Sequence, residues 1–127
     1  MKGKTILVVD DEQALRFLYE EALSDEGYDV IVARNGKEAL RLVEEKSPDL
    51  VVLDIVMPEM DGLEAIPQIL RKHRKIPLIL HTGHSGYQDD FMTWAADAYV
   101  MKSSDLGELK GKIKELLSTS YPDENAQ

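Results

Sequence analysis

Cysteine is absent from this chain of 127 residues. Its absence excludes disulfides, thiolate-bound zinc, iron–sulfur clusters and cysteine nucleophiles, so a metal site must use oxygen or histidine ligands. Long apolar runs are also absent, since none exceeds four residues, whereas a membrane-spanning helix needs about twenty. The first apolar stretch stops at Asp10 and Asp11, which makes it too short for a signal peptide. We therefore expect a soluble, cytoplasmic protein with no membrane partner.

Positive charge is scarce. The chain has 15 lysines and arginines against 24 acidic residues, which gives a net charge of −9. A surface that binds nucleic acid directly needs a basic stripe, so we expect no nucleic-acid partner. The length suits one domain with a core that needs no metal or disulfide support. We expect this domain over residues 1–119 and a polar C-terminal tail over residues 120–127.

Short aliphatic segments recur along the chain, which is typical of strands buried on both faces of a sheet. The predicted strands are 6–9, 30–33, 50–53, 78–80 and 98–101. The first helix is predicted between the first two strands and ends before Gly27. Its apolar stripe consists of Leu15, Leu18, Tyr19, Ala22 and Leu23. A second helix is expected between the turn at Asn35-Gly36 and Pro48.

The remaining helices are predicted from capping and spacing signals. Asp61 and Glu64 have the spacing of a capping box at the start of a helix, and Pro67 predicts a kink or a late start. A further helix is expected within 83–97, and apolar spacing over 106–117 predicts the last one. Strands and helices alternate, which predicts an α/β fold with a five-stranded parallel sheet covered by helices on both faces.

Polar side chains follow several of the predicted strands, at the sheet edge where ligands of open α/β folds bind. They are Asp10 and Asp11, Asp54, His81 and Thr82, and Lys102. Each has a plain structural interpretation: a helix cap for Asp11 or Thr82, a turn acid for Asp54, and an exposed surface lysine for Lys102. Together they indicate a site, because three clustered carboxylates stay ionised only if a cation offsets their charge. An oxygen-rich site with few protein ligands suits Mg²⁺.

Such a site contains the functional groups that phosphoryl transfer needs. A carboxylate attacks phosphorus to form an aspartyl phosphate, while positive groups neutralise the transferred oxygens. Asp54 is the predicted nucleophile because it ends the central strand. Thr82 would supply a hydroxyl and Lys102 a second cation.

The acidic pair in Val8-Val9-Asp10-Asp11-Glu12 and the segment from Leu53 through Asp54 to Gly62, with Thr82 and Lys102, resemble the CheY-like receiver domain of two-component response regulators. The resemblance runs from residue 5 to about 117. It implies a flavodoxin-like fold with strand order 2-1-3-4-5. It also implies a phosphoacceptor that catalyses its own phosphorylation and slow dephosphorylation, rather than an ordinary enzyme.

The resemblance assigns roles to individual residues. Mg²⁺ or Mn²⁺ would bind Asp10, Asp11, Asp54 and the backbone carbonyl of Val56. Asp54 would take its phosphoryl group from a sensor histidine kinase or a phosphotransfer protein, and Thr82 and Lys102 would contact the phosphoryl oxygens. Tyr99 matches the switch aromatic, and Val56 and His84 occupy positions that modulate hydrolysis. Phosphorylation would change the surface of the helix within 83–97, strand 98–101 and the last helix, which would bind an output protein or a missing effector domain.

Other interpretations remain open. Ser103 follows Lys102 where the family usually has a cis proline, which leaves room for an interaction module that works without phosphorylation. A haloacid-dehalogenase-like phosphatase also uses an aspartate nucleophile, but it needs a second acid where this chain has Val56. A flavin mononucleotide carrier is disfavoured because the acidic loop after the first strand repels phosphate. His81 and His84 are a weak candidate pair for a transition metal, since no third nitrogen ligand is evident.

Overall fold

The computed structural model describes residues 3–57, 60–73, 75–83, 95–102 and 106–119. Its strands are β1 (Thr5–Val9), β2 (Asp29–Ala33), β3 (Leu50–Leu53), β4 (Leu78–Thr82) and β5 (Ala98–Met101). They form one sheet in the order β2-β1-β3-β4-β5, and all neighbours are parallel. The predicted fold class and strand order are confirmed. β4 runs two residues further than predicted, because His81 and Thr82 still pair with β5.

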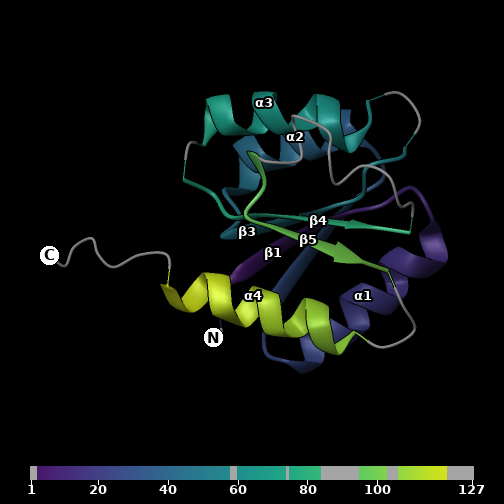
Figure 1. Ribbon diagram of the computed structural model, residues 1–127, viewed down its shortest axis with the longest axis vertical. Coiled ribbons are helices and arrows are strands. Elements are labelled where there is room, and N and C mark those ends of the chain that lie inside the picture. The colour runs from purple at the N-terminus through teal and green to yellow at the C-terminus, as the bar shows by residue number, and fades with distance from the viewer. Residues whose placement is uncertain (1–2, 58–59, 74, 84–94, 103–105, 120–127) are drawn as a thin grey trace, which may run out of the picture.

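Four helices cover the sheet within the described residues. They are α1 (Gln13–Asp25), α2 (Gly36–Lys46), α3 (Gly62–Lys72) and α4 (Gly107–Thr119). α2 and α3 lie on one face, and α1 and α4 lie on the other (Figure 1). Each pair packs on its own apolar core, one containing Leu7, Leu53 and Ile66 and the other containing Val8, Val52 and Ile113.

α1 lies where the sequence predicts it, but its buried stripe is narrower than expected. Tyr19 and Leu23 are its buried residues, whereas Leu18 is 45% exposed. One residue corresponds to about 100° around a helix, so a helix that buries Tyr19 and Leu23 turns Leu18 away from the sheet. The prediction that Leu18 belongs to the buried stripe is therefore wrong.

α3 starts at its predicted cap. The Asp61 carboxylate accepts the Glu64 N–H at 2.9 Å, and the Glu64 carboxylate accepts the Asp61 N–H at 3.1 Å, which confirms the capping box. A late start at Pro67 is wrong, because the helix begins at Gly62 and continues through the proline. Pro67 lies on the exposed side of α3, while the reciprocal cap bonds fix the first turn.

Several predictions fall on residues outside the described part of the chain. They concern most of the helix expected within 83–97, the side chain of His84, the peptide at Ser103 and the tail 120–127. Among the described residues, no helix has the length and apolar character that crossing a bilayer requires.

Candidate functional site

Three carboxylates meet at the carboxyl edge of the sheet. β1 and β3 are neighbours, and Val9 pairs with Leu53, so the residues that follow them lie side by side. One oxygen each from Asp10, Asp11 and Asp54 lies within 4.8 Å of the others. Asp10 and Asp54 are buried, and Asp11 is exposed. The predicted acidic cluster is therefore present, with two carboxylates in the protein and one facing solvent.

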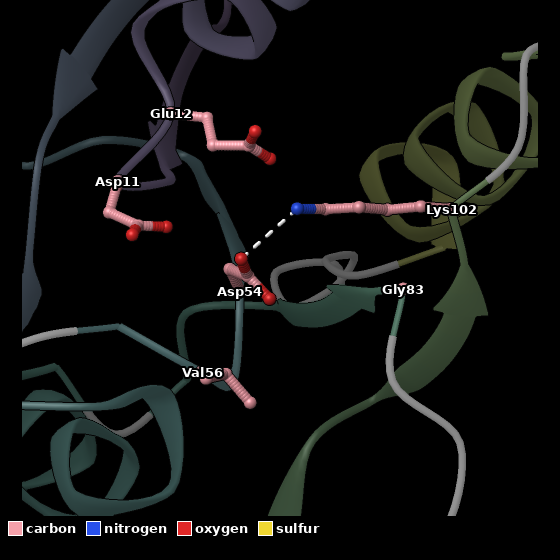
Figure 2. Close-up of a pocket in the computed structure, with 6 residues that line it drawn as sticks. All are labelled: Asp11, Glu12, Asp54, Val56, Gly83 and Lys102. Atoms are coloured by element: carbon pink, nitrogen blue, oxygen red, sulfur yellow. Dashed lines mark hydrogen bonds and ion pairs between the residues drawn. The ribbon is translucent and has the colours of Figure 1, made fainter.

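Lys102 joins the two buried carboxylates. Its Nζ atom lies 2.7 Å from Oδ2 of Asp10 and 3.0 Å from Oδ2 of Asp54, and Figure 2 shows its side chain extended toward Asp54. Burial opposes the charge on Lys102, but the bonds to both carboxylates outweigh it and raise the pKa of the ammonium. Burial also raises the pKa of Asp54, although Lys102 works in the opposite direction. A cation beside the buried Asp54 carboxylate favours its ionised form.

Hydrogen bonds fix the orientation of both buried acids. Oδ1 of Asp54 accepts the N–H of Ile55 at 2.7 Å, and Oδ1 of Asp10 accepts the N–H of Glu12 at 3.0 Å. Glu12, not Asp11, is the N-cap residue of α1, and it makes no side-chain cap bond. The interpretation of Asp11 as a helix cap is therefore wrong.

A pocket of about 420 Å³ opens above Asp54. It is lined by Asp11, Glu12, Asp54, Val56, Gly83 and Lys102. In Figure 2, Asp11 and Glu12 come from the turn after β1, whereas Lys102 approaches from the end of β5. Val56 is 39% exposed at this pocket. Sequence reasoning gave no role to Glu12, although its place directly after the acidic pair could have indicated one.

Thr82 and Tyr99 are not among the residues that line this pocket. Thr82 is fully buried at the end of β4, and its backbone carbonyl accepts the N–H of Lys102 at 2.8 Å. Tyr99 lies on β5 opposite Leu80 and packs, half-buried, against the core under α2 and α3. Their predicted phosphoryl-contact and switch roles remain predictions.

His81 lies on the face of the sheet that α1 covers. Its ring packs against Tyr19 with the ring centres 5.2 Å apart. Burial and the positive charge of Lys102 lower its pKa to about 4, so the ring is neutral near pH 7. Within the described residues, its buried Nδ1 has no hydrogen-bond partner. This packing supports the interpretation of His81 as a core residue rather than a metal ligand.

Gly62 brings the start of α3 close to Asp54. Its N–H donates to the carbonyl of Ile55 at 2.8 Å. A Cβ atom at Gly62 would lie 2.2 Å from the backbone oxygen of Asp54, so no side chain fits here. The sequence placed Gly62 in the resembling motif but did not predict this contact.

The donor set suits a hard divalent cation. Mg²⁺ prefers oxygen ligands and usually binds through one or two carboxylates while keeping several waters. Three carboxylate oxygens close together beside an open pocket fit that preference. A lysine ammonium at the same carboxylates adds a group that can neutralise negative charge on a transferred phosphoryl.

Comparison with known proteins agrees with this geometry. The sequence profile of the response regulator receiver domain matches residues 6–114. The chain is 48% identical to the response regulator TrrA of Thermotoga maritima, whose crystal structure is a complex with Mg²⁺-BeF; the TM-score is 0.86, over 89% of this chain and 98% of TrrA. A crystal structure of the histidine kinase ThkA in complex with TrrA matches with a TM-score of 0.84, at 48% identity, over 90% of this chain and 98% of that one.

Among curated relatives, the probable transcriptional regulator ycf27 of Porphyridium aerugineum is 40% identical over 92% of this chain. The match covers 49% of that relative, so the chain spans about half its length. The protein belongs to the response regulator receiver domain family of two-component systems. This family consists of phosphoacceptors rather than ordinary enzymes, so the haloacid-dehalogenase interpretation loses its support.

Proposed function

We propose that Asp54 is the phosphoacceptor of this receiver and that its phosphorylation depends on Mg²⁺ or Mn²⁺. The observation that carries the proposal is the cluster of Asp10, Asp11 and Asp54 oxygens within 4.8 Å, with Lys102 bound to two of the three acids. TrrA, the similar receiver, was crystallised with Mg²⁺-BeF. Asp54 is the natural nucleophile because it borders the pocket and ends the central strand.

In the proposed reaction, an oxygen of the Asp54 carboxylate attacks the phosphorus of a phosphohistidine. The new O–P bond forms as the P–N bond breaks, and the electron pair leaves with the imidazole nitrogen, which takes up a proton. Asp10, Asp11, Asp54 and the Val56 carbonyl would hold the metal ion, which when bound neutralises phosphoryl oxygens. Lys102 adds a positive charge to the same oxygens, and Thr82 donates its hydroxyl.

Slow hydrolysis of the acyl phosphate by the receiver itself would return it to the resting state, at a rate influenced by Val56 and His84. Val56 lines the pocket and is apolar, so it cannot orient an attacking water through a hydrogen bond. Tyr99 would act as the switch that changes the surface formed by segment 83–97, β5 and α4.

The proposed phosphodonor is a sensor histidine kinase or a phosphotransfer protein, and the ThkA complex of TrrA supports a kinase. The proposed receiver unit is 1–119, followed by the tail 120–127. Curated relatives about twice as long include transcriptional regulators, which supports an effector domain or a separate output protein. We further propose a cytoplasmic location, in keeping with a chain that takes its phosphoryl group from a kinase.

Intact-mass measurement after incubation with acetyl phosphate tests the proposal. We expect one phosphoryl adduct that requires Mg²⁺ and is absent from Asp54→Ala. Asp49→Ala is the matched control, because Asp49 lies directly before β3, at the end of the strand away from Asp54, where its carboxylate accepts the N–H of Thr5. This control should still form the adduct. A folded wild-type protein that forms no adduct would instead favour an interaction module that works without phosphorylation.

A further inference from the structure

The main-chain carbonyl of Asp10 is held by a side chain from α1. Nη1 of Arg16 donates to this carbonyl oxygen at 2.7 Å. Side chains on a helix lean toward its N-terminus, which lets Arg16 reach back over the first turn of α1. Asp10 is only 2% exposed, so its carbonyl has little access to water and needs a donor from the protein.

This bond completes the set of contacts around Asp10. The N–H of Asp10 donates to the carbonyl of Ala33 at 3.1 Å. Its Oδ1 accepts the N–H of Glu12, and its Oδ2 pairs with Lys102. Every polar group of Asp10 is therefore engaged, and Arg16 is the side chain that fixes the carbonyl at the start of the turn 10–12.

Asp11 depends on the same turn. In the described part of the chain, its carboxylate has no hydrogen bond or ion pair of its own. The main chain on either side therefore sets its position. That main chain is held by the Asp10 contacts and by the first turn of α1, where the N–H of Arg16 donates to the carbonyl of Glu12 at 3.0 Å.

We infer that Arg16 is a positioning residue, which holds the turn 10–12 so that Asp10 and Asp11 are set to bind a divalent cation. The inference rests on the proposed function, in which these acids hold Mg²⁺. It predicts that Arg16 strengthens Mg²⁺ binding, although its positive charge alone would weaken it. A positive guanidinium near a cation site weakens binding by repulsion, whereas a guanidinium that orients the ligands strengthens it.

The sign of the change in Mg²⁺ affinity therefore separates the two effects. Arg16→Met keeps much of the side-chain length but removes the charge and the donors. If the residue acts through charge alone, Mg²⁺ should bind this variant more tightly. Loss of an outer partner of metal ligands typically costs about 10–100-fold in affinity. Because Arg16 acts through the main chain, we expect Mg²⁺ to bind Arg16→Met about tenfold more weakly.

The experiment is a Mg²⁺ titration of the whole chain. Binding is measured by calorimetry and by the shifts of the amide NMR signals of Asp11 and Glu12. Arg16→Lys keeps the charge and a donor and should recover most of the affinity. Arg41→Met is the matched control, because Arg41 is exposed on α2 and pairs with Glu38 and Glu45. This control loses the same charge and should change affinity less than about twofold. Unfolding midpoints in EDTA measure any general loss of stability.

Weaker binding by Arg16→Met at both low and high salt, with Arg41→Met unaffected, would support the inference. Equal or tighter binding by a folded Arg16→Met would overturn it and leave the proposed function intact. A wild-type protein that binds no Mg²⁺ would overturn both. If Arg16→Met does not fold, the wild-type guanidinium is followed during the Mg²⁺ titration: slow rotation of its Nη groups with a change in their signals as Mg²⁺ binds supports the inference, and free rotation that Mg²⁺ leaves unchanged contradicts it.

Discussion

His81 shows how a single residue can be costly to bury and still remain in the core. Its ring contacts Tyr19, and its Nδ1 has no partner among the described residues. A buried polar atom without a hydrogen bond costs about 1–3 kcal/mol. A phenylalanine at this position would keep an aromatic ring against Tyr19 and remove the unsatisfied nitrogen.

His81→Phe should therefore change how stability depends on pH. The folded pKa of His81 is about 4, against 6.5 for the ordinary side chain. As the pH falls from 6.5 to about 4, the His81 ring takes up a proton in the unfolded chain before it does so in the folded protein. The free energy of unfolding therefore falls over this pH range. Between about pH 8 and about pH 5, protonation linked to His81 should lower the free energy of unfolding by about 2 kcal/mol. Urea unfolding at both values should show this loss in the wild type and a correspondingly smaller loss in His81→Phe.

His81→Leu serves as the control for ring packing. It lacks both the titratable nitrogen and the aromatic contact, so its pH dependence should match that of His81→Phe while its stability at about pH 8 is lower. If all three proteins lose the same stability on acidification, His81 does not titrate as its burial requires.

At the scale of single residues, the sequence predicted Asp10, Asp54 and Lys102 because strand ends meet at one edge of a parallel sheet. The same rule could not predict which side chains support them. Arg16 reaches Asp10 through a carbonyl, and Tyr19 meets His81 across two elements far apart in sequence. Such contacts depend on how α1 is rotated against the sheet, and apolar spacing fixes that rotation only coarsely.

At the scale of elements, two helical glycines have opposite surroundings. Gly62 opens α3 against the backbone of Asp54, and a Cβ atom there would meet its oxygen at 2.2 Å. Gly111 lies within α4, where a Cβ atom would meet nothing within 4 Å. Glycine is thus required by close packing at the first position, and it only weakens the helix at the second.

We expect alanine to have opposite effects at these two positions. Gly62→Ala forces two backbone segments apart and should lower the free energy of unfolding by about 2–3 kcal/mol. Gly111→Ala should raise it by about 0.5–1 kcal/mol, because alanine loses less conformational freedom in a helix. Denaturant unfolding midpoints measure both changes. Shifts in the same direction would contradict this account of the contact between α3 and Asp54.

The sequence predicted which segments form helices and strands better than it predicted how those elements pack and where they end. The capping box identified the start of α3 correctly, while Pro67 suggested a disturbance that the helix does not show at its start. Local signals of this kind work when the side chain acts on its own backbone, as Asp61 does. They fail where tertiary packing decides, as in the exposure of Leu18 or the extension of β4 to Thr82.

At the scale of the whole molecule, the negative charge destabilises the folded state, whereas a cation bound at the acidic cluster stabilises it. A net charge of −9 destabilises the compact state through self-repulsion, and the acidic cluster adds to this repulsion locally. Monovalent salt screens all of these charges. A bound divalent cation stabilises the folded state in addition, by about 2.7 kcal/mol at a hundredfold excess over its dissociation constant.

This difference can be measured by thermal unfolding in MgCl₂ and in NaCl of equal ionic strength. The wild type should be more stable in MgCl₂. Asp11→Asn should lose that extra stability, because Asp11 supplies one of the clustered oxygens. Asp25→Asn removes the same charge from an exposed position at the end of α1 and should keep it. In NaCl, both variants should be at least as stable as the wild type, since each relieves repulsion. An equal gain from MgCl₂ in all three proteins would mean that Mg²⁺ acts by screening alone, without binding at Asp11.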